Sequence, residues 1–306
     1  MKKKTILALT TAFVMGALAV TPLFAQDTKT ANDKLLKAVY EANEADMDLA
    51  IEQGADIFMT GRYAKNLLHL LVEDPIAETY SASKDISFLK TYDSKKSVVA
   101  QKLIDLGVDV NAKSSSGDTP LMYAAMNNYN KVVETYIKNK ADVNAVNNNG
   151  DTALIKTIEE RYMYGHRINK SRYFDIIKTL IEKGANVNTN RSRALLYAVY
   201  ASDLSTVKIL LDAGSKTNKN IYYNATAINN KYKRKYDELI DKESKGKLVS
   251  QNDIEWRNKD MEITKEIMKL VIPEEVKVEE QKKFQEKMMK AFEENAVYKP
   301  QYTLPQ

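Results

Sequence analysis

Residues 107–188 read GVDVNAKSSSGDTPLMYAAMNNYNKVVETYIKNKADVNAVNNNGDTALIKTIEERYMYGHRINKSRYFDIIKTLIEKGANVN, and this stretch decides the fold. The phrases GVDVN, KADVN and GANVN alternate in it with GDTPLMYAA and GDTALIKT. Thr119 and Thr152 lie 33 residues apart, and so do Gly107 and Lys140. A fixed period of this length indicates copies of one small structural unit, each of which needs neighbours to bury its apolar side.

Each unit is predicted to be a pair of short helices followed by a polar loop. Thr119 can cap the first helix, and Pro120 suits its first turn because the N–H that proline lacks would be unbonded there. The second helix, around Val132 and Val133, ends near Lys140, where other copies carry the glycine favoured just after a helix end. Polar residues after these helix ends are expected to bond the backbone of the loop; they are Asp109, Asp142 and Asn186.

The 33-residue period and the phrase TPLMYAA from Thr119 resemble the ankyrin-repeat family. The resemblance implies an all-α fold, a solenoid of about six helix-pair repeats with β-hairpin-like fingers. It places the repeats in residues 33–273 and gives His69 a structural hydrogen bond between repeats. Function in such a protein comes from the stacked surface rather than from a single cleft.

Three repeats are longer than the family pattern. Asn66 to Gly107 spans 41 residues where the pattern has 21, and Thr152 to Gly184 spans 32. The sixth repeat is longer as well, so repeats 2, 4 and 6 carry insertions, all between their two helices. The loop between Asn188 and Arg193 is instead short and lacks glycine, which predicts a blunted finger.

Residues 1–25 have the pattern of a signal peptide. Lys2, Lys3 and Lys4 precede an apolar run, Pro22 breaks the run, and Ala25 ends a segment of small residues. We therefore expect an exported bacterial protein, periplasmic or secreted, with a linker at 26–32 and no stable membrane span after cleavage. An uncleaved membrane anchor is the alternative. A lipoprotein anchor is excluded because the chain has no cysteine.

Residues 274–306 are predicted to form a C-terminal helix and a flexible tail. Phe284, Met288 and Phe292 recur at helical spacing and form one apolar stripe. The stripe suits a capping helix that covers the last repeat, and a helix that docks on a partner is the alternative.

Composition and motifs argue against catalysis. Without the three leader lysines the chain has 43 basic and 41 acidic residues, a net charge of +2, which gives no reason to expect nucleic acid as a partner. Phosphate-binding, dinucleotide-binding, zinc-protease and nucleophile-elbow motifs are missing. Two histidines and no cysteine make a transition-metal site improbable. We expect no enzyme, no cofactor and no metal, and a monomer.

The resemblance implies a protein partner bound by finger tips and first helices, the concave face. Carried over by position, with two tyrosines of the fourth repeat's insertion added, the candidate contact residues are Ser115, Ser116, Asp118, Met126, Asn127, Asn148, Asn149, Asp151, Glu159, Glu160, Tyr200, Tyr162 and Tyr164. The aromatic residues of the insertions, Trp256 included, either pin the insertions to the repeats or face a partner. The segment NKYKRKYDELIDK is either a solvated helix face or a site for an anionic polymer.

The sequence thus predicts a non-enzymatic scaffold that binds another protein through its concave face or its tyrosine-rich insertion edge. Two alternatives stay open. One is binding of cell-wall glycan or a small ligand, with tyrosines as a stacking platform, and the other is release as a secreted effector.

Overall fold

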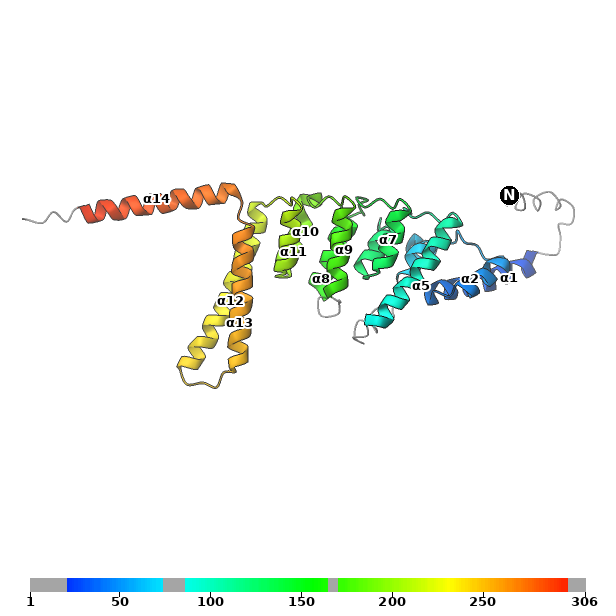
Figure 1. The fold of residues 1–306 in the computed structure, drawn as a ribbon, viewed down its shortest axis with the longest axis horizontal. Coiled ribbons are helices and arrows are strands. Elements are labelled where there is room, and N and C mark those ends of the chain that lie inside the picture. The colour runs from blue at the N-terminus through cyan, green and yellow to red at the C-terminus, as the bar shows by residue number, and fades with distance from the viewer. Residues whose placement is uncertain (1–20, 74–85, 165–169, 297–306) are drawn as a thin grey trace, which may run out of the picture. The chain divides into compact units, whose positions relative to one another are not determined.

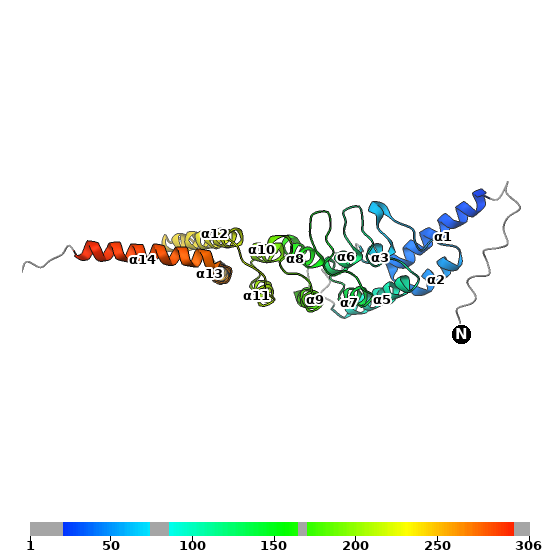
Figure 2. The ribbon, with the colours of Figure 1, turned by 90° about the horizontal axis from the view of Figure 1, so that it is seen from above.

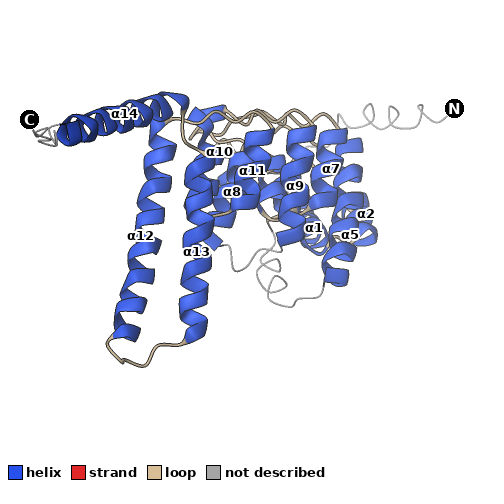
Figure 3. Cartoon of the chain, turned by 60° about the vertical axis from the view of Figure 1, so that its left-hand side comes forward, coloured by secondary structure: helices blue, strands red, loops and turns tan. Residues whose placement is uncertain are grey.

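The computed structural model describes residues 21–73, 86–164 and 170–296, and within these ranges the chain forms helices, turns and loops but no strand (Figure 3). The predicted all-α fold is confirmed. The chain divides into two compact units, residues 1–148 and 149–306, each of which is described by itself.

The described residues of the first unit form three helix pairs. They are α1 (Thr21–Glu41) with α2 (Glu44–Glu52), α3 (Leu67–Leu71) with α5 (Ile86–Asp105), and α6 (Pro120–Met126) with α7 (Asn130–Lys138). A short 3-10 turn, η1 (Arg62–Ala64), precedes α3. The first helices α1, α3 and α6 pack on one another in a row, and α5 packs on α7 in a second row (Figure 2).

The second unit repeats this plan and ends with a further helix. Its pairs are α8 (Ala153–Tyr164) with α9 (Lys170–Glu182), α10 (Thr189–Tyr200) with α11 (Leu204–Asp212), and α12 (Lys219–Ser244) with α13 (Gln251–Leu270). Helix α14 (Glu274–Ala296) follows. The first helices α8, α10 and α12 again pack in a row (Figure 2).

The predicted start and stop signals act as expected. The Thr119 hydroxyl accepts a hydrogen bond from the Met122 N–H at 3.4 Å, and Pro120 occupies the first turn of α6. Gly107 and Lys140 each follow a second helix and have φ of +100° and +67°. A lysine is strained in this left-handed region, whereas a glycine is not. The repeat that ends at Lys140 therefore has a less favourable residue at this turn than the repeats that have glycine there.

Neighbouring fingers are joined by side-chain and backbone hydrogen bonds rather than by strands. The predicted loop role of Asp109 and Asp142 is confirmed, because their carboxylates accept the N–H groups of Asn111 and Asn144 at 2.8 and 2.9 Å. The Asn111 side chain in turn accepts a hydrogen bond from the Asp142 N–H and donates one to the Lys140 carbonyl. It therefore binds the backbone of the next repeat. Asn111 is therefore a link between repeats, and Asn188 of the NVN phrase is another, since it donates to the Gly214 carbonyl and accepts the Lys216 N–H.

The blunted finger at the start of α10 is also confirmed. Asn190, Arg191 and Ser192 all have left-handed backbone, with φ between +51° and +59°. Three successive non-glycine residues in this region store strain, which the surrounding contacts must offset. Asn190 supplies one such contact, since its amide donates to the Asn149 carbonyl at 3.2 Å.

The insertion of the sixth repeat lengthens both helices of its pair. Helix α12 has 26 residues and α13 has 20, and together they form a hairpin that projects from the row of shorter helices (Figure 1). We call residues 227–263 the arm. No residue of the arm is buried, whereas Ile221, Tyr222, Ala225, Thr264 and Ile267 at its base are. The insertions of repeats 2 and 4 include residues 74–85 and 165–169, which lie outside the described residues.

The two ends of the described chain differ from expectation in one respect each. Helix α1 begins at Thr21, so residues 26–32 belong to a helix rather than to a linker, and Ala31 is buried. Helix α14 is formed as predicted, but the only buried residue among its described side chains is Val276. Its cover of the last repeat is thus confined to its first turns, where Glu280 accepts the Tyr222 hydroxyl at 2.8 Å. The predicted apolar stripe of Phe284, Met288 and Phe292 lies among side chains that the structure does not describe.

None of the helices in the described ranges combines the length and the hydrophobicity needed to cross a membrane.

Candidate functional site

Three tyrosines from α8 and α10 pack against one another in the second unit. The ring centroid of Tyr162 lies 6.1 Å from that of Tyr197, nearly parallel to it, and 5.6 Å from that of Tyr200. Tyr197 and Tyr200 meet edge to face at 6.3 Å. Tyr162 is nevertheless 43% exposed. We call Tyr162, Tyr197 and Tyr200 the tyrosine cluster.

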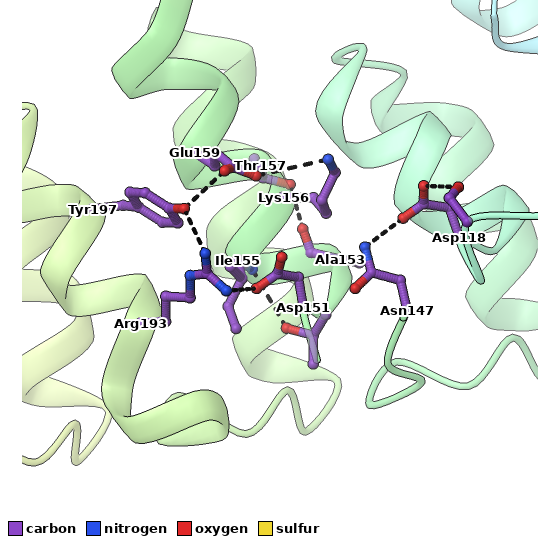
Figure 4. Close-up of polar contacts among 12 residues, drawn as sticks. Asp118, Asn147, Asp151, Ala153, Ile155, Lys156, Thr157, Glu159, Arg193 and Tyr197 are labelled. Carbon is purple, nitrogen blue, oxygen red and sulfur yellow. Dashed lines mark hydrogen bonds and ion pairs between the residues drawn. The ribbon is translucent and has the colours of Figure 1, made fainter. Parts of the chain in front are cut away.

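A network of the buried Asp151 and the half-buried Glu159, Arg193 and Tyr197 holds the tyrosine cluster in place (Figure 4). The Tyr197 hydroxyl donates to Glu159 at 2.8 Å and accepts a hydrogen bond from Arg193 at 3.1 Å. Arg193 also pairs with Asp151 at 3.1 Å, and its guanidinium lies 5.4 Å from the centre of the Tyr197 ring. These contacts join α8 to α10 and fix the ring orientation, so the cluster is a preformed surface rather than a set of mobile side chains.

Burial explains the titration behaviour of this network. It raises the pKa of the Asp151 carboxyl, and the nearby Arg193 charge opposes that shift. Burial also raises the pKa of the Tyr197 hydroxyl, helped by its hydrogen bond to Glu159. The Tyr197 hydroxyl therefore keeps its proton, which it donates to Glu159 in the hydrogen bond that positions its ring.

The finger candidates of the first unit serve mainly to join loops. Asp118 is buried and accepts hydrogen bonds from Asn147 at 2.7 Å and from Ser116 at 2.6 Å (Figure 4). Asn148 donates to the Ser115 carbonyl, and its own N–H reaches the Ser116 carbonyl at 3.0 Å. Ser115, Ser116 and Asn148 keep exposed side chains and can still meet a partner.

The remaining candidates fall into three groups. Asp151 is only 2% exposed and is enclosed by the network above, so, like Asp118, it positions its neighbours and offers no free surface. Met126, Asn127 and Glu160 are half-buried, and Asn127 donates to the Val72 carbonyl at 2.8 Å. Asn149 is exposed, and the side chain of Tyr164 lies outside the description.

Two aromatic features were missed by the sequence analysis. Tyr197 completes the cluster, and its spacing of three residues from Tyr200 on one helix could have pointed to it. Tyr63 and Phe58 form the second feature, because they precede α3 with exposed fractions of 70% and 63%. Tyr63 has left-handed backbone with φ +60°, and its carbonyl accepts the Ser115 N–H at 2.7 Å.

His69 has the structural role that the resemblance implied. Its side chain is fully buried, and Nε2 lies 3.0 Å from the Asp118 carbonyl oxygen of the next repeat. Burial lowers the pKa of the imidazole, although the Asp118 carbonyl opposes that shift. Within the described residues, no group of three or more histidine, aspartate or glutamate side chains is arranged to hold a metal ion.

The stacked helix pairs, the joined fingers and the interrepeat histidine define a repeat protein of the ankyrin class. Residues 91–166 match a family model described as ankyrin repeats in three copies. Residues 91–166 therefore carry ankyrin repeats, and within each unit the helix pairs stack as in an all-α ankyrin-repeat fold.

Two curated proteins are similar to parts of this chain. A protein of fowlpox virus (strain NVSL), named as an ankyrin repeat protein, FPV244, is 26% identical over 203 residues, which cover 61% of this chain and 29% of the viral protein. The mitochondrial disaggregase of Bos taurus is 31% identical over 134 residues, or 44% of this chain and 19% of the bovine protein. The chain therefore spans less than a third of the length of either relative.

Proposed function

We propose that this protein is a non-enzymatic scaffold that binds a partner protein through the tyrosine cluster and the first-helix face around it. Ankyrin repeats are modules for protein–protein interaction, which supports the general class. The observation that carries the proposed site is the combination of three mutually packed rings with a partly exposed Tyr162.

The physical reason lies in how tyrosine binds. A tyrosine offers a large contact area with only two side-chain torsions to immobilise, so little conformational entropy is lost when it contacts a partner. In this cluster the loss is smaller still, because Glu159 and Arg193 already fix Tyr197. Binding energy in protein interfaces concentrates in such preorganised aromatic residues.

We further propose that the protein acts outside the cytoplasm as a monomer, in the periplasm or after secretion. The support is the sequence pattern of residues 1–25, in which a charged start precedes an apolar run and small residues. The mature chain would begin at Gln26, within the first two turns of α1. Fractionation of the native host tests this proposal: mass spectrometry of the exported chain should find an N-terminus at Gln26, and an intact chain in the cytoplasm would overturn it.

The binding proposal is tested with the double variant Tyr162→Ala/Tyr200→Ala. The wild-type chain is first used to capture and identify a partner from an envelope extract, and the partner is then purified and titrated. We expect the double variant to weaken binding by at least about tenfold, as for aromatic hot spots. Trp256→Ala is the matched control, because it removes an exposed aromatic residue outside the cluster and should leave the affinity unchanged.

Two outcomes would overturn the binding proposal. One is a double variant that stays folded by circular dichroism and binds the purified partner as tightly as the wild type. The other is retention of the wild-type chain on isolated peptidoglycan with no stoichiometric protein partner, which would favour the glycan-binding alternative.

A further inference from the structure

The segment that follows the fifth repeat has a one-sided charge. Residues 213–236 contain six basic residues and no acidic residue: Lys216, Lys219, Lys231, Lys233, Arg234 and Lys235. The chain without its leader is close to neutral, so this segment is a local excess and does not reflect the overall composition. Most of it is the first part of α12.

Helix α12 brings part of this charge beside the tyrosine cluster. The Tyr200 hydroxyl donates to Asn224 of α12 at 3.3 Å. Lys231 and Lys235 lie seven and eleven residues after Asn224, which places all three on one stripe of the helix. Lys231 is about 10 Å further along the helix axis than Asn224, a distance that three or four extended residues cover.

The two lysines of this stripe are not neutralised locally. Within the described ranges, no carboxylate forms an ion pair with Lys231 or Lys235, and the neighbouring Arg234, 74% exposed, reaches Glu238 only at 4.0 Å. Three acidic groups near the tyrosine cluster are in contrast paired: Glu159 with Lys156 at 3.7 Å, Asp151 with Arg193 at 3.1 Å, and Asp203 with Arg161 at 3.7 Å. The uncompensated charge on this side of the second unit is therefore positive.

We infer that the ligand of this face is an acidic segment of a partner protein. An aromatic or apolar side chain of that segment packs on Tyr162 and Tyr200, and the carboxylates that flank it meet Lys231 and Lys235. This inference rests on the proposed function and adds the chemistry of the partner. Complementary charge of this kind raises the association rate and selects among partners more than it adds to affinity.

A protein segment suits these observations better than a single-stranded nucleic acid. Binding of a phosphate backbone needs a basic track that continues over many residues. Here Asp237, Glu238 and Asp241 follow the basic residues on the same helix, and the positive stripe ends after Lys235. A short acidic peptide can use two lysines, whereas a polynucleotide would run on into carboxylates.

The experiment uses the purified full chain and a labelled peptide of eight glutamates with one tyrosine at its start. A peptide with glutamine in place of each glutamate is the neutral control. The charge-reversal variant Lys231→Glu/Lys235→Glu is compared with Lys242→Glu/Lys247→Glu, which changes net charge equally at the far end of the arm, where both lysines are exposed. Circular dichroism verifies that both variants are folded.

We expect the acidic peptide to bind and the neutral peptide to bind much more weakly. Lys231→Glu/Lys235→Glu should weaken binding about tenfold, and the control pair less than twofold, because exposed charges separated by more than about one Debye length are screened. Binding should also weaken several-fold between about 50 and 300 mM salt.

Three results would overturn the inference: equal binding of both peptides, equal effects of the two charge-reversal pairs, or tighter binding of a single-stranded oligonucleotide than of the acidic peptide. A natural partner that binds Lys231→Glu/Lys235→Glu with unchanged affinity but is lost by Tyr162→Ala/Tyr200→Ala would refute the acidic ligand and leave the proposed function standing. A natural partner that binds both double variants with unchanged affinity would refute both the acidic ligand and the proposed function.

Discussion

The pair α6–α7 and the pair α12–α13 are built from the same unit and obtain their stability differently. Helices α6 and α7 have only 7 and 9 residues, yet most of α6 and one whole face of α7 are buried. Helix α12 is nearly four times as long as α6, and α13 is about twice as long as α7, but their buried residues are confined to the base of the hairpin. Greater length has added surface and not core.

The polar contacts of the two regions differ in the same way. In the compact pair they cross between elements: Tyr136 of α7 donates to the Leu68 carbonyl of α3 at 2.8 Å, and Asn127 reaches Val72. Ion pairs of the arm are mostly local, three or four residues apart, as between Lys245 and Asp241. Local pairs on an exposed helix add only tenths of a kcal/mol each. The repeats are therefore the stable frame, and the arm is a support for surface chemistry.

The largest expected difference between the two regions comes from a core truncation. Leu121→Ala should lower the free energy of unfolding by about 3 kcal/mol, because a fully buried leucine leaves a cavity. Leu239→Ala, at a half-buried position of the arm, should cost about 1 kcal/mol or less, because the site can collapse or fill with water. Urea denaturation followed by circular dichroism measures both. Equal costs would contradict the division into frame and arm.

Two glycines, one in a finger of the repeats and one in the arm, test the same comparison through a smaller loss of stability. Gly117 and Gly246 have similar φ, +77° and +70°, so alanine should cost each about 1 kcal/mol in backbone strain. A Cβ on Gly117 would also lie 2.8 Å from the Asn148 backbone nitrogen in the adjoining finger, whereas the space around Gly246 is open. Gly117→Ala should therefore cost about 1 kcal/mol more than Gly246→Ala, since the fingers must separate. Similar losses in thermal melts would show that the finger contact adds nothing.

The same contrast explains how much of the fold was predictable. Periodicity and capping residues identify the repeat pairs because each helix end has a chemical marker, such as Thr119 or Gly107. The short loop before Arg193 likewise predicts the blunted finger by counting alone. The shape of an insertion has no such marker: NKYKRKYDELIDK is compatible with a helix, but nothing in it specifies that α12 would continue unbroken into a two-helix arm.

The candidate site was predictable only in part, for a related reason. Family geometry points to exposed positions of fingers and first helices and includes Tyr200 and Glu159, while Tyr162 was added from the tyrosine-rich insertion. It does not distinguish a side chain that faces a partner from one that faces the next repeat, which is why Asp118 and Asp151 were included although both are buried. Tyr197 was missed because its role depends on Arg193 and Glu159, which meet only after folding.

A third prediction concerns pH and separates the frame from the arm, because the buried histidine lies in the frame. The pKa of His69 is lowered in the folded state, so below its ordinary value of 6.5 the unfolded chain binds the proton more strongly. Stability should be fully present above pH 6.5 and should fall as the pH drops through the folded-state pKa. His69→Gln should have a shallower dependence of unfolding free energy on pH between 7 and 5. His166 is retained in both proteins, so an unchanged slope would mean that His69 does not carry the effect.

The smallest expected effect is that of Trp256→Ala on the arm. Trp256 is the single tryptophan of the chain and is 71% exposed, so its removal should change the free energy of unfolding by less than about 0.5 kcal/mol. In the wild type its fluorescence should change little on unfolding, because the indole is already in contact with water. Unfolding should therefore give a clear transition in circular dichroism and only a small change in tryptophan emission. A strongly blue-shifted emission from the native chain would mean instead that something covers Trp256 in solution, and the arm would have to be regarded as packed rather than exposed.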